Sequence, residues 1–457
     1  MPLKNIMDNI DPLIRHGLFD ARVPRYTSYP PANHFQNAVG QRHQVDWLHT
    51  VPNGSDVSVY VHIPFCKRLC WFCACRTQGT KTLRPVDAYV SFLLKEINAV
   101  RMALPKGVRM GRLHLGGGTP TILSPEKMTT LLNALFAAFD RSADFEFSVE
   151  IDPTDASDAV LYTLIGFGMN RASIGVQDFA ADVQNAIGRV QTLAQTRHVV
   201  DLLRDKSVAS LNFDLLYGLP HQTADSFGET LAHVAQIRPD RLAIYGYAHV
   251  PWMSKRQVMI KTENLPDNET RFALAEQARE TFAGQGYTCI GIDHFALPDD
   301  SLSHAATSGT LRRNFQGYTD DQSSTLIGLG ASAISRFTGG YVQNAPATSA
   351  YQERVGTGGL AANKGYAMSA HETLIARIIE DLMCRFVYDE HGLGAAFPDQ
   401  VELIHQTSVS LMQQFGDVFY IGQSGLEMRE DTKPLVRIIA RFVDGFASEA
   451  SAHSAAI

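Results

Sequence analysis

Residues 57–75 read VSVYVHIPFCKRLCWFCAC, and this stretch decides the architecture that we expect. Its first half alternates branched apolar residues with others, as a strand does, and four cysteines then follow within ten residues. Similar runs recur downstream with helical periodicity between them; the six strand candidates are 57–64, 111–118, 145–152, 172–177, 210–218 and 242–249. This alternation predicts an α/β fold with a parallel sheet, and six units are too few for a closed eight-stranded barrel.

Polar residues stand at the ends of these strand candidates. In a parallel α/β sheet the carboxyl ends of the strands face one edge, and ligands bind at that edge. We therefore expect the following residues to meet there: HIPFC and GGGTP after the first two strands, Glu150 and Asp152, Gln177 and Asp178, Asp214, and Ala248 with His249. Their convergence predicts a single functional site.

Sequence pattern divides the chain into three expected parts. Residues 1–50 lack a clear period and predict an ordered but irregular N-terminal arm. Residues 51–365 hold the barrel and an extension that is rich in glycine from about residue 309. Residues 366–457 are mostly of helical period and predict a separate, mainly helical C-terminal domain. Ser124 and Thr223 are the expected N-caps of two barrel helices.

Composition and charge limit the function classes. The 457 residues are 45% hydrophobic and 19% charged, which supports a large folded core. Lys and Arg number 40 against 47 for Asp and Glu, a formal charge of −7, so no general positive field for nucleic acid is expected. The N-terminus carries charges where a signal peptide is apolar, and no window offers the roughly 18 apolar residues of a membrane span. We expect a soluble, cytoplasmic protein.

The cysteines at positions 66, 70 and 73 are spaced C-x3-C-x2-C, and Cys75 follows. Such crowding in a large cytosolic chain suits a metal or cluster better than disulfides. Three thiolates on one loop can hold an iron–sulfur cubane with one iron open to another ligand, whereas four would close every iron. The alternative is a structural zinc site that uses all four cysteines, but zinc sites usually have two C-x2-C pairs spaced apart.

Beyond single motifs, an ordered series carries a resemblance. The motifs are PRYTSYP, YVHIPFC, C-x3-C-x2-C-x-C, LHLGGGTPT, EIDP, GVQDF, NFDLLYGLP, YAHVP, IDHFA, RNFQGYT and GASAIS. In this order they resemble the oxygen-independent coproporphyrinogen III oxidase (dehydrogenase) family of radical S-adenosylmethionine (SAM) enzymes. The resemblance runs from about residue 22 into the C-terminal domain, so it covers nearly the whole chain.

The resemblance implies a fold and an activity. The fold is a partial (β/α)6, TIM-like barrel. The activity is the anaerobic oxidative decarboxylation of two propionates of coproporphyrinogen III to vinyl groups, which yields protoporphyrinogen IX in haem biosynthesis. The reaction uses a 5′-deoxyadenosyl radical made from SAM at a [4Fe-4S] cluster. A monomer is implied, with an electron donor and an electron acceptor that the sequence does not identify.

The resemblance also implies roles for individual residues. Cys66, Cys70 and Cys73 are the implied cluster ligands, and Cys75 is an implied catalytic thiol that does not ligate the cluster. The loop departs from the common family pattern at Ala74, Arg76 and Thr77. Two SAM molecules per chain are implied, held by Tyr60, Phe72, Gly117, Gly118, Thr119, Glu150, Gln177, Arg189, Asp214, Ala248 and Ile334.

A substrate with four carboxylates needs a local cationic patch in an acidic protein. The candidates are Arg22, Arg25, Lys67, Arg68, Arg76, Arg312 and Arg313. His62, His114, His249 and His294 are expected to be structural or outer-shell groups.

Two rival readings share the barrel and the cluster motif. A non-enzymatic haem-binding chaperone usually lacks the PRYTSYP arm and the fourth cysteine, and this chain has both. A radical SAM enzyme that methylates and opens haem is expected to diverge in the C-terminal half, whereas IDHFA and RNFQGYT match the biosynthetic family.

Overall fold

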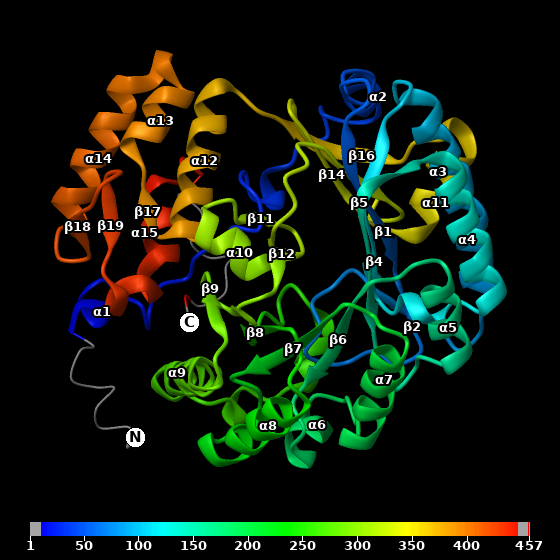
Figure 1. Cartoon of the computed structure of the whole chain (residues 1–457), viewed down its shortest axis with the longest axis horizontal. Coiled ribbons are helices and arrows are strands. Elements are labelled where there is room, and N and C mark those ends of the chain that lie inside the picture. Colours follow the sequence, from blue (N-terminus) through cyan, green and yellow to red (C-terminus); the bar gives the residue numbers. More distant parts are fainter. Residues whose placement is uncertain (1–10, 447–455, 457) are drawn as a thin grey trace.

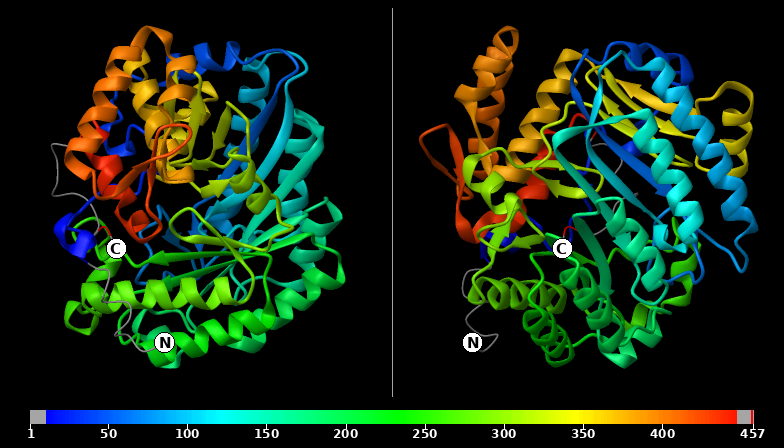
Figure 2. Two further views of the ribbon diagram at one scale, coloured as in Figure 1. Left: turned by 60° about the vertical axis from the view of Figure 1, so that its left-hand side comes forward. Right: turned by 45° about the vertical axis from the view of Figure 1, so that its right-hand side comes forward.

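A computed structural model describes residues 11–446 and 456, and the six predicted strands are all present in it (Figure 1). They are β1 (Asp56–Ile63), β4 (Arg109–Gly117), β5 (Asp140–Ile151), β6 (Arg171–Gln177), β7 (Ser210–Tyr217) and β8 (Arg241–Gly246). Each pairs in parallel with the next. The helices between them are α3 (Arg84–Ala103), α4 (Pro125–Ala138), α5 (Asp158–Gly166), α6 (Ala181–Ala186), α7 (Leu193–Asp205) and α8 (Ala224–Ile237). These helices cover the outer face of the curved sheet (Figure 2).

The helix starts follow local sequence. The Ser124 hydroxyl accepts a hydrogen bond from the Lys127 N–H, and the Thr223 hydroxyl accepts one from the Ser226 N–H, as expected of N-caps. The Ser226 hydroxyl also accepts a hydrogen bond from the Thr223 N–H, so a serine completes a capping box at the start of α8.

The glycine-rich extension contains strands that the sequence did not reveal. β13 (Leu326–Leu329) pairs in parallel with the open side of β1, and β14 (Ile334–Phe337), β15 (Gly340–Asn344) and β16 (Ala362–Ala367) continue the sheet antiparallel. At the other edge, β10 (His294–Ala296) and β9 (Thr288–Ile290) pair antiparallel beyond β8. A Cβ at Gly328 would lie 2.5 Å from the Ile334 carbonyl oxygen, so glycine here allows backbones to approach closely.

The inside of the barrel is polar. Alternate residues of the parallel strands face the helices and form the apolar core, and the residues between them face inward. Near the amino ends of the strands, Arg112 lies 2.7 Å from Glu146 and 3.1 Å from Asp320. Arg241 lies 2.6 Å from Asp300. These ion pairs occupy the interior of the barrel near the amino ends of the strands. A ligand site is therefore expected at the carboxyl ends.

The N-terminal arm packs on the C-terminal domain. Tyr26 and Tyr29 share a hydrophobic cluster with that domain, and the Tyr26 hydroxyl donates to Asp444 at 2.9 Å. The arm is not wholly irregular as expected, because Gln41–His49 form α2. The domain contains α12 (Ala370–Arg385), α13 (Glu390–Ala396), α14 (Val401–Phe415), α15 (Val436–Val443) and a small sheet of β17 (Val387–Tyr388), β19 (Leu426–Met428) and β18 (Phe419–Ile421). The boundaries at residues 50 and 365 stay predictions.

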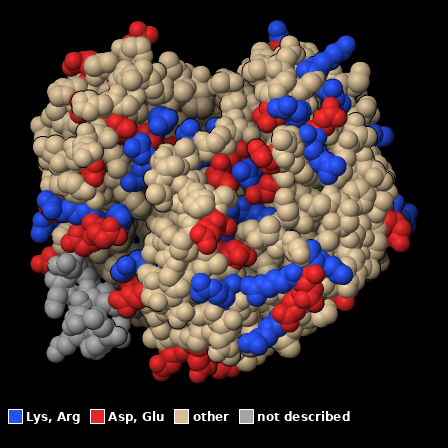
Figure 3. Space-filling model, viewed as in Figure 1, with Lys and Arg blue, Asp and Glu red and all other residues tan. Residues whose placement is uncertain are grey.

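The remaining elements are short or peripheral. They are α1 (Asp11–Arg15), β2 (Phe65–Cys66), β3 (Gln78–Gly79), α9 (Asn268–Gly284), α10 (Ser301–Ser308), β11 (Arg312–Asn314), β12 (Gly317–Thr319) and α11 (Thr348–Gly358). On the face shown in Figure 3, basic and acidic side chains are interspersed. Within the described range, no helix combines the length and apolar character that crossing a membrane requires.

A buried carboxylate joins α3 to the extension. Glu96 accepts hydrogen bonds from the Gly330 N–H (2.7 Å), the Asn344 side-chain amide (2.6 Å) and the Tyr351 hydroxyl (2.7 Å). Burial raises the pKa of Glu96 to about 7, although these hydrogen bonds oppose the shift. The carboxyl group thus holds the turn after β13 against the helix that follows the cysteine loop.

Glu96→Ala is expected to lower the free energy of unfolding by about 2–5 kcal/mol, because three buried donors lose their acceptor. Chemical denaturation of the purified protein measures the change. Glu353→Ala, at an exposed position of α11, is the control and should change stability by less than about 0.5 kcal/mol. Equal stability of the two variants would show that Glu96 does not hold the extension.

Candidate active site

The cysteine loop leaves the carboxyl end of β1 and returns by pairing β2 with β3. Cys70 is buried, Cys66 and Cys73 are partly buried, and Cys75 is exposed. Burial raises the pKa of the Cys66 thiol to about 11 and also raises the pKa of the Cys70 thiol. A hydrogen bond from Cys75 lowers the pKa of Cys73 to about 6. Cys75 therefore contacts one of the three expected ligands without taking a ligand position in the C-x3-C-x2-C motif.

The donor set of this loop fits a cluster. It offers three soft thiols, and the Arg189 guanidinium donates to the Cys70 sulfur at 3.7 Å, which favours a negatively charged thiolate. Within residues 11–446 and 456, no group of three or more His, Cys, Asp or Glu side chains is close enough to hold a single metal ion. Three soft thiols on one loop are the donor set that an iron–sulfur cubane takes.

The glycine turn after β4 packs directly on the start of the cysteine loop. The Gly118 N–H donates to the Ile63 carbonyl at 2.8 Å, and the Thr119 N–H donates to the Phe65 carbonyl at 2.9 Å. A Cβ at Gly118 would lie 2.6 Å from the Phe65 carbonyl oxygen. Glycine is thus required there because backbone, which cannot move aside, occupies the space. The turn orients the chain as it enters Cys66.

Glu150 lies beside the same turn. The Gly117 N–H donates to Glu150 Oε2 at 3.0 Å, and His114 Nε2 lies 3.3 Å from Glu150 Oε1. Burial opposes ionisation, but the His114 and Gly117 contacts outweigh it and lower the pKa of Glu150. The His114 ring stacks on Tyr60, whose hydroxyl lies 2.9 Å from His62 Nδ1. These histidines support Tyr60 and Glu150, as expected for outer-shell groups.

Asp214 lies inside the barrel on β7. Its two carboxylate oxygens accept hydrogen bonds from the Ser173 hydroxyl at 2.8 Å and the Asn212 amide at 2.9 Å. Burial raises the pKa of Asp214, and the negative charge of Glu150 adds to the increase. The site therefore holds two carboxyl groups whose environments push their pKa values in opposite directions.

Arg189 is buried rather than solvated. It pairs with Asp152 at 2.9 Å and donates to the Gly175 carbonyl at 2.8 Å, besides its contact with Cys70. Gln177, at the end of β6, has a positive φ of 68°, and a Cβ at Gly175 would lie 3.2 Å from its amide nitrogen. Asp152 was expected at this edge, but its pairing with Arg189 was not. The arginine connects β5 and β6 to the cysteine loop.

The segment 254–257, which follows β8, donates several hydrogen bonds to the cysteine loop. The sequence contained no recognisable signal for this contact. The Gln257 amide donates to the Phe72 carbonyl at 2.7 Å and to the Ala248 carbonyl at 3.0 Å. Ser254 donates to the Cys73 carbonyl at 3.1 Å, and Arg256 donates to Thr77. Phe72 and Ala248 are thus held together by one side chain. Ile334 is the first residue of β14. In the order of the sheet, β14 lies beyond β13 and β1, on the side away from β8.

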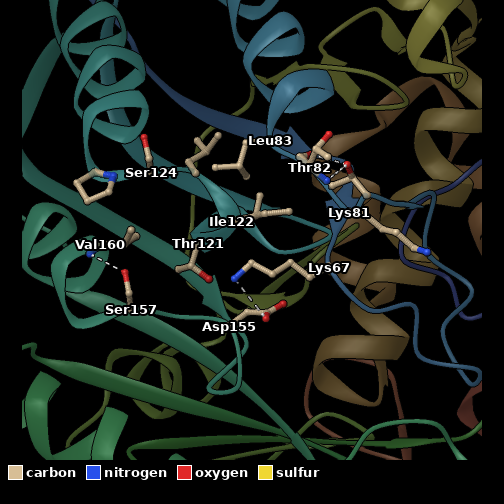
Figure 4. A pocket seen from close by; sticks show the side chains of 13 residues that line it. Lys67, Lys81, Thr82, Leu83, Thr121, Ile122, Ser124, Asp155, Ser157 and Val160 are labelled. Atoms are coloured by element: carbon tan, nitrogen blue, oxygen red, sulfur yellow. Dashed lines mark hydrogen bonds and ion pairs between the residues drawn. The ribbon is translucent and has the colours of Figure 1, made fainter.

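A separate pocket of about 310 Å³ lies between the cysteine loop and the starts of α4 and α5 (Figure 4). Lys67 points into it and pairs with Asp155 at 3.5 Å. The expected SAM contacts do not line the pocket, and Lys67, one of its two lysines, already has an acidic partner.

Comparison with known proteins first identifies the class. The radical SAM superfamily model matches residues 60–234. The solved coproporphyrinogen III oxidase of Escherichia coli, itself described as a radical SAM enzyme, superimposes with a TM-score of 0.88. It is 34% identical and covers 92% of this chain and 97% of its own. The predicted fold class is confirmed, and the class implies SAM and a [4Fe-4S] cluster.

Closer relatives identify the family. The oxygen-independent coproporphyrinogen III oxidase of Paracoccus denitrificans is 50% identical, over 99% of this chain and 100% of its own length. The protein of the same description from Cereibacter sphaeroides is 49% identical, over 98% and 100%. This chain belongs to the oxygen-independent coproporphyrinogen III oxidase family, as its motifs predicted.

Gly118→Ala is expected to displace the cysteine loop, because its Cβ meets the Phe65 and Ile63 carbonyls at 2.6 and 2.9 Å. Such overpacking costs about 1–3 kcal/mol or more, and iron and sulfide content after anaerobic reconstitution should fall. Gly166→Ala, where no atom lies within 4 Å, is the control and should change stability by at most about 1 kcal/mol. Full cluster content in Gly118→Ala would contradict this role of the turn.

Proposed function

We propose that this protein decarboxylates two propionates of coproporphyrinogen III to vinyl groups, forming protoporphyrinogen IX. The observation that carries the proposal is the meeting of the cysteine loop, the glycine turn and two inward carboxylates at one end of the barrel. The names of the full-length relatives support the same substrate. We further propose a cytoplasmic monomer that takes electrons from a separate donor and passes electrons to a separate acceptor.

Cys66, Cys70 and Cys73 would hold the [4Fe-4S] cluster in this chain. When bound, the cluster and SAM together supply one-electron chemistry that generates a radical able to remove hydrogen from a propionate. Arg189 stabilises a thiolate at Cys70 through its N–H donor. Gln257, Ser254 and Arg256 hold the loop backbone in place, so the thiols keep a constant position against the barrel.

Two SAM molecules would occupy the barrel mouth. The residues that face or border this space come from the cysteine loop and the strands. They are Tyr60, Phe72, the Gly117–Thr119 turn, Glu150 and Asp214. Glu150, kept ionised by His114 and Gly117, is suited to accept hydrogen bonds from a SAM amine or ribose. The N–H groups of Arg189 already bind Asp152, Gly175 and Cys70. Arg189 would therefore act on SAM indirectly, by positioning those groups and the cysteine loop. Gln177, Ala248 and Ile334 complete the proposed contacts.

Two features support catalysis over a haem-binding chaperone. The PRYTSYP arm is ordered and packed on the C-terminal domain. Cys75 is exposed and contacts Cys73, so its thiol lies beside an expected cluster ligand and is open to a substrate.

Each of Cys66→Ser, Cys70→Ser and Cys73→Ser should abolish cluster assembly, because each removes one of the three thiolate ligands. Cys75→Ser should retain about four irons and four sulfides per chain yet lose most turnover. Iron and sulfide analysis with electron paramagnetic resonance separates the two groups. Loss of the cluster in Cys75→Ser would instead make Cys75 a ligand, and a stoichiometric zinc content without sulfide would return the loop to a structural role.

Anaerobic turnover should consume about two SAM molecules for each protoporphyrinogen IX formed, one for each propionate, if SAM is a consumed oxidant. Substrate deuterated at the propionate β-carbons should pass label into 5′-deoxyadenosine. Mass spectrometry of both products and measurement of released carbon dioxide test this. Cluster-loaded protein that binds SAM but forms no vinyl group and transfers no label would refute the decarboxylase and favour haem binding.

A further inference from the structure

Three of the seven cationic candidates for the substrate already have partners. Arg312 pairs with Glu380 at 2.8 Å, and Lys67 pairs with Asp155. Arg68 donates to the Val190 carbonyl and the Thr154 hydroxyl. A cation that is paired with a carboxylate, or that donates through both terminal nitrogens, offers little to a substrate carboxylate that must displace those partners.

Arg25 of the arm differs from them. Its Nη2 donates to the Gly246 carbonyl at 2.6 Å, at the carboxyl end of β8 and two residues before Ala248. The residue is exposed, and no carboxylate of the described residues lies within ion-pair distance of its guanidinium, although its charge acts on Asp293 from farther away and helps to lower the pKa of that carboxyl. Arg25 therefore brings a positive charge to the edge of the proposed SAM site and leaves it available to an anion.

The backbone on either side of Arg25 is held by two buried arginines. Arg437 donates to the carbonyls of Val23 (2.7 Å) and Pro24 (3.1 Å). Arg313 donates through Nη2 to the Arg25 carbonyl at 3.3 Å. Burial and the positive charges of Arg25 and Arg313 lower the pKa of Arg437 to about 9, although Tyr217 and Asp293 oppose the shift. The position of Arg25 is thus built by the fold.

Arg313 has unused hydrogen-bonding capacity. Its side chain is 4% exposed, and its Nε and Nη1 atoms have no hydrogen-bond partner among the described residues. The nearby carboxylate, Asp293, lies 3.9 Å from Nη1 and is shared with His294 at 2.7 Å. A buried guanidinium with unsatisfied donors is costly, and an anion that approaches it reduces that cost.

An apolar surface adjoins Arg22, which precedes Arg25 by three residues in the arm. Trp252 is 55% exposed and Met253 is 66% exposed, which is unusual for side chains of this size. The Arg22 guanidinium lies 5.5 Å from the centre of the Trp252 ring. Trp252 and Met253 directly precede Ser254, whose hydroxyl donates to the Cys73 carbonyl in the cysteine loop. Aromatic and thioether groups beside arginines match a molecule with an apolar macrocycle and carboxylate side chains.

From these contacts we propose that Arg25, supported by Arg313, forms a subsite for one propionate carboxylate of coproporphyrinogen III, whose macrocycle lies against Trp252 and Met253. The inference rests on the proposed function. The propionate held there is one that remains in the product. A reacting propionate loses its carboxyl group as neutral carbon dioxide, and an arginine that stabilises the carboxylate anion would oppose that loss.

The test compares ligands with and without carboxylates. Coproporphyrin III, a stable oxidised relative of the substrate, and its tetramethyl ester are titrated anaerobically against cluster-loaded protein in one detergent-containing buffer. Arg25→Gln should weaken binding of the tetracarboxylate about tenfold and leave binding of the ester unchanged. Protoporphyrin IX, which keeps two propionates, should be weakened to a similar extent. Arg25→Lys should fall between wild type and Arg25→Gln.

Arg15→Gln is the matched control, since Arg15 lies in the same arm but pairs with Asp417 at 2.8 Å. It removes the same charge and should leave all three affinities unchanged. An equal loss in Arg15→Gln, or an equal loss for acid and ester in Arg25→Gln, would overturn the subsite. Unchanged coproporphyrin III affinity in Arg25→Gln, with a wild type that forms protoporphyrinogen IX, would refute this inference alone. A wild type that forms no vinyl groups would refute the proposed function.

Discussion

The close approach of the Gly118 backbone to the carbonyls of Ile63 and Phe65 is the contact on which the rest of the site depends. It joins the carboxyl ends of β1 and β4 at the point where the chain turns toward Cys66. Because the same turn presents the Gly117 N–H to Glu150, one backbone conformation positions both the start of the cysteine loop and a carboxylate inside the barrel. No side chain fits between these backbones, so glycine is a geometric requirement.

The cysteine loop has little regular structure, and distant elements hold it. Gln257, Ser254 and Arg256 donate to it from the segment after β8, and Arg189 connects it to β5 and β6. Such a loop forms few hydrogen bonds within itself, so its carbonyl groups and thiols need partners from elsewhere. The position of the thiols is therefore a property of the whole barrel.

Local charge near the site differs from the charge of the whole chain. The formal charge is −7, yet buried arginines gather where the arm, β8 and the C-terminal domain meet. Buried guanidinium groups persist there because backbone carbonyls, tyrosines and Asp293 surround them. The arm thus contributes to the site by carrying Arg25 to the end of β8, although the arm itself forms no part of the barrel.

The sequence by itself determined the six βα units, the cysteine spacing and the strand ends that carry Glu150 and Asp214, because two-residue alternation and motif spacing are local properties. It did not reveal β13, because a strand of four residues with a central glycine has too little pattern. It also did not reveal that Arg189 is buried against Cys70, that Gln257 holds Phe72, or that Arg25 reaches Gly246. These contacts join residues 119, 185 and 221 positions apart. Only the folding of the sheet, which brings distant strand ends to one edge, decides which of them meet.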